Sequence, residues 1–330
     1  MTLLEVSQLR VNLHTHRGTA AAVRDMGFTL DRGQTLGLIG ESGCGKSMTA
    51  LALMGLTPDN STVSGSIRLG GQELVGLRDR DWRALRGRRL AMIFQEPMTA
   101  LNPVHRVGAQ IAEPMRLHQG LSAEAARQRA IGLMERVGIP DPAQRIDAFP
   151  HQFSGGQRQR IMIAMALACE PDVLIADEPT TALDVTVQKQ ILALIAELVA
   201  EQGMALVLIS HDLGVVAQNV QRMLVMYGGS VVESGTAAEV FSAPAHPYTR
   251  GLLAARPSLA QRLVAHRSER LPTIRGSVPD LFSMPSGCPF AGRCAFTEPA
   301  CAVEQPPTVP LSPTHQFSCR RAELALNAPD

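Results

Sequence analysis

A glycine-rich segment between an apolar run and a helical run restricts the fold of this chain more than any other feature. Residues 40–47 read GESGCGKS and match the pattern G-x-x-x-x-G-K-S/T. Residues 35–39 before it form a short apolar run, and residues 47–54 favour a helix. Such a loop presents converging backbone N–H groups and a helix N-terminus, both of which bind anions. The sequence therefore predicts a phosphate-binding loop.

The loop carries two side chains suited to a nucleoside triphosphate and its metal ion. Lys46 supplies a compact charge for the β- and γ-phosphates, and it is one of only two lysines among 31 basic residues. The hydroxyl of Ser47 can bind Mg²⁺. The loop residues expected to bind the nucleotide are Gly40, Ser42, Gly43, Cys44, Gly45, Lys46, Ser47 and Met48.

A second apolar run, residues 173–176, ends in the carboxylates Asp177 and Glu178. At the end of a strand, Asp177 can lie near the metal ion and Glu178 near the γ-phosphate, where it can orient and deprotonate the attacking water. Acidic residues at strand ends are common, and a helix cap at the following turn is the alternative. Together with the phosphate-binding loop, the pair predicts a site that hydrolyses nucleoside triphosphates.

The spacing of apolar residues predicts an α/β fold. The runs at 173–176 and 205–209 are apolar throughout and bounded by polar residues, as in strands buried on both faces of a parallel sheet. Between them apolar residues recur at helical spacing, with Asp184 placed to begin the helix and Gly203 to end it. Another helix is expected at 122–137, with its first serine as N-cap. Strands and helices in alternation indicate the α/β class.

The composition excludes several other classes of protein. The chain of 330 residues is 45% apolar with a net charge of +1, so it is neither disordered nor basic enough for a general nucleic-acid binder. No apolar run approaches the roughly 20 residues of a transmembrane helix. The first ten residues, MTLLEVSQLR, lack the pattern of a signal peptide. We expect a cytosolic protein that a partner holds at any membrane where it acts.

The order of the remaining motifs identifies a family. Residues 154–157, SGGQ, place a capping serine and two glycines at the head of a helix, which alone would be an ordinary helix start. The motifs occur along the chain in a fixed order: the phosphate-binding loop, Gln95, SGGQ, the carboxylate pair, Leu183-Asp184 and His211. In this order, residues 1 to about 240 resemble the ABC ATPases.

The resemblance implies a role for each position. Gln95 resembles the glutamine that senses Mg²⁺ and water and links to a transmembrane partner, and His211 resembles the switch histidine that contacts the γ-phosphate. Residues 182–184 resemble the loop that crosses a dimer interface. The residues that resemble the signature contacting ATP on the opposite subunit are Ser154, Gly155, Gly156 and Gln157. Glu178, His211 and Gln95 are thus expected to be catalytic, with Ser47 and Gln95 as Mg²⁺ ligands and Asp184 at the nucleotide.

Two positions depart from the family pattern. Phe153 stands where the signature usually begins with leucine, an apolar change that leaves the phosphate contacts intact. Leu13 stands where the family usually stacks an aromatic ring on adenine, so an apolar side chain or a neighbouring histidine is left to cover the base. The resemblance also implies a P-loop NTPase fold over residues 1–242, with a RecA-like core, an antiparallel β subdomain and a helical subdomain at about residues 97–160.

Further motifs resemble the ATPase subunits of oligopeptide and dipeptide permeases. These are His246 to Thr249, Pro103 after Leu101-Asn102, and residues 177–186. The resemblance implies an ATPase subunit that powers peptide uptake and pairs with a second ATPase subunit, in a heterodimer or, as the alternative, in a homodimer. It also implies two transmembrane permease subunits, a solute-binding protein acting indirectly, and a place on the cytoplasmic face of the bacterial membrane. Nickel, glutathione and antimicrobial peptides remain alternative cargoes.

Residues 243–330 form a proline-rich extension that holds 13 of the 22 prolines. Its four cysteines are Cys288, Cys294, Cys301 and Cys319. From their spacing alone, zinc, an iron–sulfur cluster and free thiols are all open, and the C-x2-C hairpins typical of zinc are absent. The resemblance implies a 4Fe–4S cluster, with His315 as a less favoured ligand. We expect this cluster to be structural and the phosphate-binding loop to lie in a separate core.

Two other classes of ABC protein fit the sequence less well. A DNA-repair or chromosome ATPase carries a long coiled-coil or zinc insertion between the loop and the signature, whereas here about 100 residues without heptads separate them. A soluble regulatory or translation ABC protein usually carries two cassettes, and this chain has one. Neither class is favoured, and we expect no nucleic-acid partner.

Overall fold

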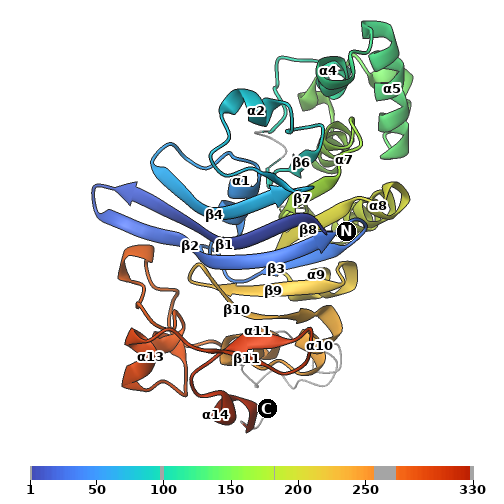
Figure 1. Cartoon of the computed structure of the whole chain (residues 1–330). Helices are drawn as coiled ribbons and strands as arrows, with labels where there is room; N and C mark the ends of the chain where they lie inside the picture. Colours follow the sequence, from blue (N-terminus) through green and yellow to red (C-terminus); the bar gives the residue numbers. More distant parts are fainter. Residues whose placement is uncertain (1, 97–99, 182, 256–272, 328–330) are drawn as a thin grey trace, which may run out of the picture.

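A sheet of eight strands, in the order β11-β12-β10-β9-β3-β8-β7-β6, runs through the middle of the computed structural model (Figure 1). The structure describes residues 2–96, 100–181, 183–255 and 273–327. The strands are β3 (Thr35–Ile39), β6 (Leu90–Ile93), β7 (Val173–Asp177), β8 (Ala205–Ser210), β9 (Arg222–Tyr227), β10 (Ser230–Thr236), β11 (Thr308–Pro310) and β12 (Gln316–Ser318). Strands β6, β7, β8, β3 and β9 pair in parallel. Every residue of β7 and β8 is buried, so the prediction of a parallel sheet from apolar runs is confirmed.

A second, antiparallel sheet has the order β2-β1-β4-β5. Its strands are β1 (Thr2–Thr15), β2 (Gly18–Asp31), β4 (Ser61–Leu69) and β5 (Gln72–Glu73). Buried side chains of β1, such as Leu4 and Leu9, pack in one core with Leu36 and Leu38 of β3. The helix after the glycine-rich loop, α1 (Lys46–Leu53), adds Leu53 to the same core. The glycine-rich loop therefore lies between two sheets that share a core.

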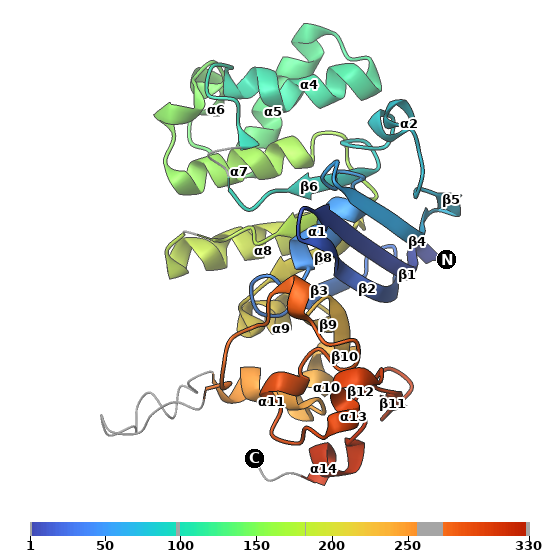
Figure 2. The same cartoon turned by 90° about the vertical axis from the view of Figure 1, so that its left-hand side faces the viewer.

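Helices cover the central sheet and form one end of the molecule, where Figure 1 shows α4 and α5 and Figure 2 also shows α6. The remaining helices before the extension are α2 (Asp79–Arg83), α4 (Val107–Gln119), α5 (Ala123–Arg136), α6 (Pro142–Arg145), η1 (Pro150–Gln152), α7 (Gly155–Ala166), α8 (Val185–Gln202), α9 (Leu213–Asn219) and α10 (Ala237–Ser242). The caps predicted for two of them are confirmed. Ser122 accepts from the backbone of Ala125 at the start of α5, Asp184 caps α8, and Gly203 ends α8 with a φ of 62°.

The extension occupies the opposite end, next to β10 (Figure 2). Its elements are α11 (Pro247–Ala254), η2 (Leu281–Ser283), η3 (Ala291–Arg293), α13 (Pro299–Val303), strands β11 and β12, and α14 (Ala322–Asn327). Strand β12 pairs antiparallel with β10, so the extension continues the central sheet and covers the edge that β10 would otherwise expose. Phe290 of the extension packs in the main hydrophobic core. Cys44 of the phosphate-binding loop packs in the other core, with β1 and α1, so the loop and Phe290 lie in separate hydrophobic cores, as expected.

Candidate nucleotide-binding and hydrolysis site

The backbone of the glycine-rich loop requires glycine at two of its positions. Gly40 and Gly45 have φ angles of 155° and 100°, a region that side chains disfavour. A Cβ atom at Gly40 would lie 2.2 Å from the carbonyl oxygen of Met226, and one at Gly45 would lie 2.3 Å from that of Ala22. These contacts press the loop against β9 and β2. The glycines in the predicted motif are therefore needed for the loop to close.

Lys46 is buried and lies over the loop. Its Nζ donates hydrogen bonds to the carbonyl oxygens of Gly40, at 2.8 Å, and Glu41, at 3.1 Å. The Cys44 side chain is fully buried, and burial raises the pKa of its thiol. The side chain of Cys44 therefore packs inward, and its backbone N–H donates to the carbonyl oxygen of Glu41 at 3.3 Å. The loop keeps its cation where the β- and γ-phosphates of a nucleotide would lie.

Ser47 and Asp177 meet where a magnesium ion is expected. The Ser47 hydroxyl donates to Oδ1 of Asp177 at 3.2 Å, across the carboxyl end of β7. Asp177 is 5% exposed, and burial raises the pKa of its carboxyl group, with the Ser47 bond acting in the opposite direction. A hard divalent cation bound by oxygen ligands would favour the ionised carboxylate here. The donor set thus fits Mg²⁺.

Three polar side chains converge on one oxygen of Glu178. Its Oε2 accepts from Nε2 of Gln95 at 3.2 Å and from the Thr181 hydroxyl at 2.9 Å, and Nδ1 of His211 lies 3.2 Å away. Glu178 has a φ of 45°, an unusual backbone conformation for a residue other than glycine. The structure thus brings together the three residues expected to be catalytic. Thr181 was not predicted; its place three residues after Glu178 was the available indication.

A cavity of about 320 Å³ lies beside the loop. It is lined by Leu13, Ala22, Ser42, Gly43, Gly45, Lys46, Ser47, Met48, Gln95, Glu178 and Leu281. Leu13, the position that lacks the usual aromatic ring, therefore faces the site. Leu281 was not predicted; it belongs to the extension, more than 200 residues further along the chain, so no local pattern could indicate it. Gly40 and Cys44 are absent from this lining, consistent with their inward positions.

The signature residues lie elsewhere in the same chain. Ser154 caps α7 by accepting from the backbone N–H of Gln157, whose side chain accepts in return from the backbone N–H of Ser154. Gly155 is exposed and Gly156 half-buried at the same helix start. Asp184 accepts from the backbone N–H groups of Thr186 and Val187 as the cap of α8. None of these residues lines the cavity described above.

The four cysteines of the extension line one small, apolar cavity of about 20 Å³, together with His246 and Phe290. All four are free thiols. Burial raises the pKa of Cys288 to about 11 and also raises the pKa of Cys294 and Cys319. Within the described ranges, no three histidine, cysteine or acidic side chains are close enough to hold a metal ion. The described part of the extension therefore contains no formed metal site, although the sequence predicted one there.

His315, the less favoured ligand, lies away from this cavity. Its Nε2 is 2.8 Å from Oε1 of Glu233, and both side chains are buried. The same carboxylate accepts from the backbone N–H groups of Ala245 and His246. His315 therefore has a polar structural role between β10 and the extension.

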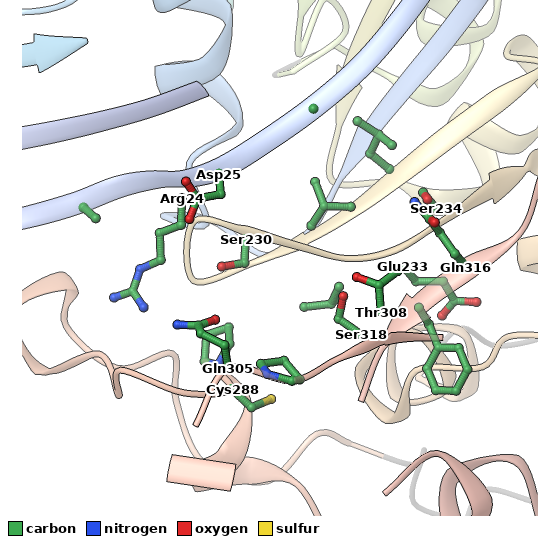
Figure 3. Close-up of a pocket in the computed structure, with 18 of the residues that line it drawn as sticks. Arg24, Asp25, Ser230, Glu233, Ser234, Cys288, Gln305, Thr308, Gln316 and Ser318 are labelled. Carbon is green, nitrogen blue, oxygen red and sulfur yellow. The ribbon is translucent and has the colours of Figure 1, made fainter. Parts of the chain in front are cut away.

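A larger cavity, about 470 Å³, separates part of the extension from the sheets (Figure 3). Arg24 and Asp25 of β2 and Ser230 of β10 lie on one side of it, and Gln305 and Cys288 of the extension lie on the other. It is distinct from the cavity beside the phosphate-binding loop. Across it, Arg24 reaches the extension through a hydrogen bond of 3.0 Å to the carbonyl oxygen of Pro285.

Two family profiles match the chain. That of the ABC transporter family covers residues 23–181, and that of the oligopeptide/dipeptide transporter C-terminal region covers residues 232–301. The dipeptide transport ATP-binding protein DppD of Bacillus subtilis is 48% identical over 99% of this chain and 98% of its own length. The oligopeptide transport ATP-binding protein OppD of Salmonella typhimurium is 48% identical over 96% of this chain and 93% of its own.

Solved structures show the same fold. A dimeric ATP-binding cassette in a post-hydrolysis state, bound to ADP and phosphate, matches with a TM-score of 0.64 and 25% identity, over 71% of this chain and 99% of that chain. CbiO1 of Clostridium perfringens, part of an ABC transporter complex, matches with a TM-score of 0.61 and 28% identity, over 73% of this chain and 91% of its own. Within the described part of the chain, no helix has the length and apolar character needed to cross a membrane. The motifs, the fold and the similarity over nearly the whole length agree: this chain belongs to the ATP-binding subunits of the oligopeptide/dipeptide family of ABC transporters.

Proposed function

We propose that this protein binds and hydrolyses ATP to power the uptake of dipeptides or oligopeptides across the cytoplasmic membrane. The observation that carries the proposal is the convergence of Gln95, Thr181 and His211 on Glu178, beside a closed phosphate-binding loop. The similarity to DppD and OppD over nearly their full length supports peptides as the cargo. The test is reconstitution with permease subunits and a solute-binding protein in vesicles, followed by uptake of a labelled dipeptide with and without ATP. Nickel and glutathione, offered in parallel, test the alternative cargoes.

The residues divide the work of hydrolysis among them. The loop N–H groups and Lys46 hold the phosphates, while Ser47, Gln95 and Asp177 would hold Mg²⁺, which supplies charge neutralisation at the phosphate oxygens. Because all three contacts from described residues fall on Oε2 of Glu178, its Oε1 is oriented to take the proton of the attacking water. His211 contacts the γ-phosphate from the exposed side, where 61% of its side chain is accessible.

The nucleotide would be enclosed between two subunits. The signature at Ser154 begins α7 on a solvent-exposed surface and does not line the cavity beside its own loop, so a second ATPase subunit is needed to bring a signature to this nucleotide. Asp184 would lie at that interface. A heterodimer with a related subunit is proposed, with a homodimer as the alternative. ATP would favour closure of the dimer and ADP would not, which couples hydrolysis to transport.

The adenine base of ATP would lie against two leucines. Leu13 and Leu281 both line the cavity beside the loop, and Leu281 is held there by its neighbours. Asp280 forms an ion pair of 3.1 Å with Arg17, and the Arg17 guanidinium lies 4.6 Å from the centre of the Phe282 ring. The extension thus offers an apolar wall in place of the aromatic ring that Leu13 replaces.

The permease subunits would bind near Gln95 to Pro103, so that dimer closure moves them. Residues 97–99 of this segment lie outside the described residues. At its two sides, Phe94 is 38% exposed and Val104 is 74% exposed, apolar surface suited to a transmembrane partner. We place the protein as a peripheral subunit on the cytoplasmic face of the bacterial membrane, and the solute-binding protein acts through the permease. A DNA-repair or regulatory ATPase remains a distant alternative.

A 4Fe–4S cluster in the extension is proposed on one observation, the four cysteines around a single apolar cavity. Thiols with raised pKa values are weak ligands until a metal draws off their protons. The choice of a four-iron cluster over a zinc ion rests on the resemblance to the dipeptide-permease ATPases, which carry such a cluster on this segment. The C-x2-C hairpins typical of zinc are absent from it. The cluster would supply a covalent tie between Cys288, Cys294, Cys301 and Cys319.

A further inference from the structure

The extension reaches the phosphate-binding loop through one arginine. Arg293 donates from Nη1 to Oε2 of Glu41 at 2.5 Å and from Nη2 to Oε1 at 3.3 Å. The two residues are 252 positions apart, and Glu41 is the second residue of the loop. The pairing is bidentate, the geometry in which an arginine fixes the orientation of a carboxylate as well as its position.

This ion pair is largely removed from water. The Arg293 side chain is 6% exposed and that of Glu41 is 27% exposed. Nη1 also donates to the Tyr227 hydroxyl at 3.2 Å. Burial alone would lower the pKa of Arg293, but the hydrogen bonds to Glu41 and Tyr227 outweigh it and the pKa is raised. Arg293 is therefore charged at any physiological pH, and removing it would leave a partly buried carboxylate without its partner.

A second contact holds the backbone of the same loop residue. The backbone N–H of Glu41 donates to the hydroxyl of Tyr248 on α11 at 2.8 Å. Tyr248 packs against Tyr227, with ring centres 4.7 Å apart, and against Phe290, at 5.4 Å. Phe290 precedes η3, the short turn that carries Arg293. The aromatic cluster therefore fixes the position of the turn relative to the loop.

Glu41 also contacts Lys46, the side chain expected to bind the phosphates. Its carbonyl oxygen accepts from Nζ of Lys46 at 3.1 Å. The backbone N–H, the carbonyl and the carboxylate of Glu41 are thus bonded to Tyr248, Lys46 and Arg293, respectively. Because three groups of Glu41 are hydrogen-bonded, this loop residue has little freedom to move. One of its three partners is Lys46. A change at Arg293 should therefore alter how Lys46 and the loop N–H groups meet a phosphate.

Arg293 also lies within the cysteine segment. Its own N–H donates to the carbonyl of Phe290 at 3.0 Å, and the next residue, Cys294, donates to the same carbonyl at 3.1 Å. The N–H of Ala291 donates to the carbonyl of Cys288 at 3.1 Å. One turn therefore bears Arg293 between two of the four cysteines. On the other side of Cys288, the polar cavity of Figure 3 separates the extension from β2 and β10.

We propose that Arg293 is a positioning residue of the ATP site, which holds the phosphate-binding loop through Glu41 and links ATP affinity to the order of the cysteine turn. The inference rests on the ATP binding proposed above. It adds to that function a dependence of the ATP site on the turn of the extension that carries Arg293. Without the ion pair, the loop would populate its binding conformation only part of the time, and the apparent Kd rises in inverse proportion to that fraction.

The experiment measures the Kd of Mg-ATP for the purified full-length chain, by competition with a fluorescent ATP analogue. Arg293→Met is expected to raise the Kd about tenfold, as for a loop that is competent about a tenth of the time. Glu41→Gln should do the same, and the double variant should be no weaker than either single one, because both remove one interaction. Arg293→Lys, which keeps the charge but loses the bidentate fork, should fall between wild type and Arg293→Met.

The matched control is Arg127→Met. Arg127 also forms a bidentate pair, with Asp147 at 2.7 and 2.9 Å, and lies on α5 at the opposite end of the molecule from the extension (Figure 2). Its variant should bind ATP like wild type, with a comparable thermal unfolding midpoint. If Arg293→Met does not fold, Arg293→Lys carries the test. A wild-type Kd for the arginine variants, or additive losses in the double variant, would overturn the proposal; absence of ATP binding by the wild-type chain would instead overturn the proposed function.

Discussion

The hydroxyl of Thr181 donates a hydrogen bond of 2.9 Å to Oε2 of Glu178, the oxygen that Gln95 and His211 also approach. Glu178 is 13% exposed as a side chain, so its orientation is set by these partners more than by water. A base for water activation must point its acceptor oxygen at the attacking water. Thr181 is therefore expected to affect the chemical step and not the binding of ATP.

Thr181→Val should lower kcat about tenfold and leave the KM for ATP unchanged, because the lost bond orients Glu178 and does not contact substrate. Thr181→Ser, which keeps the hydroxyl, should restore most of the rate. The measurement is steady-state ATP hydrolysis by the assembled transporter. Thr186→Val, at an exposed position of α8, is the matched control. A rise in KM with normal kcat would show that Thr181 acts on nucleotide binding instead.

Much of the fold followed from local patterns. Strands such as β7 and β8 are apolar throughout, and α8 carries its cap, Asp184, and its terminating glycine, Gly203, at its ends. These features act over a few residues, so one sequence suffices to read them. The glycine-rich loop could be placed for the same reason, because its motif, strand and helix are contiguous.

The contacts that join the extension to the ATP site could not be predicted from such patterns. Glu41 and Arg293 meet in a fold in which β10 pairs with β12 and Phe290 enters the main core. Strand β12 is three residues long, too short for an alternation of apolar and polar residues to be visible. Long-range pairing of short strands depends on the folded surroundings more than on local preference.

Ser154→Arg tests whether the ATP site is shared between subunits. A bulky cation at this exposed helix start should block the nucleotide of the partner subunit, so hydrolysis by the assembled transporter should fall at least about a hundredfold. The isolated variant chain should still bind ATP at its own loop. Ser122→Arg, which removes the corresponding cap of α5, controls for the cost of losing a cap, about 1 kcal/mol. Loss of ATP binding by the folded, isolated Ser154→Arg chain would point to a site within one chain.

Leu281→Ala tests whether Leu281 contacts the adenine base of ATP in the cavity beside the loop. The variant loses apolar surface next to the base, which at about 25 cal/mol per Å² weakens ATP binding by about 1 kcal/mol. Inorganic tripolyphosphate lacks a base, so its affinity should not change. Leu311→Ala is the control, at a 39% exposed leucine of the extension that does not line the cavity. Equal losses for ATP and tripolyphosphate would mean that Leu281 supports the loop and not the base.

The cysteine site is tested by anaerobic purification. The wild-type chain should contain iron and acid-labile sulfide, with visible absorbance from charge transfer between thiolate and iron. Cys319→Ser should lose the cluster and make the extension more sensitive to proteolysis, because metal binding stabilises its fold. Cys169→Ser, a cysteine outside the extension, should keep the iron. Stoichiometric zinc without iron or sulfide would contradict the cluster and leave a four-thiolate site.

The central claim, that Glu178 activates water in a transport ATPase, is tested most directly by Glu178→Gln in the reconstituted transporter. Amide nitrogen and oxygen keep the shape of the side chain but cannot accept the proton, so ATP hydrolysis and dipeptide uptake should both fall by about 10²- to 10⁴-fold. ATP binding should be retained, and Glu197→Gln, at an exposed position of α8, should behave like wild type. Hydrolysis by Glu178→Gln within about twofold of the wild-type rate would contradict the role of Glu178.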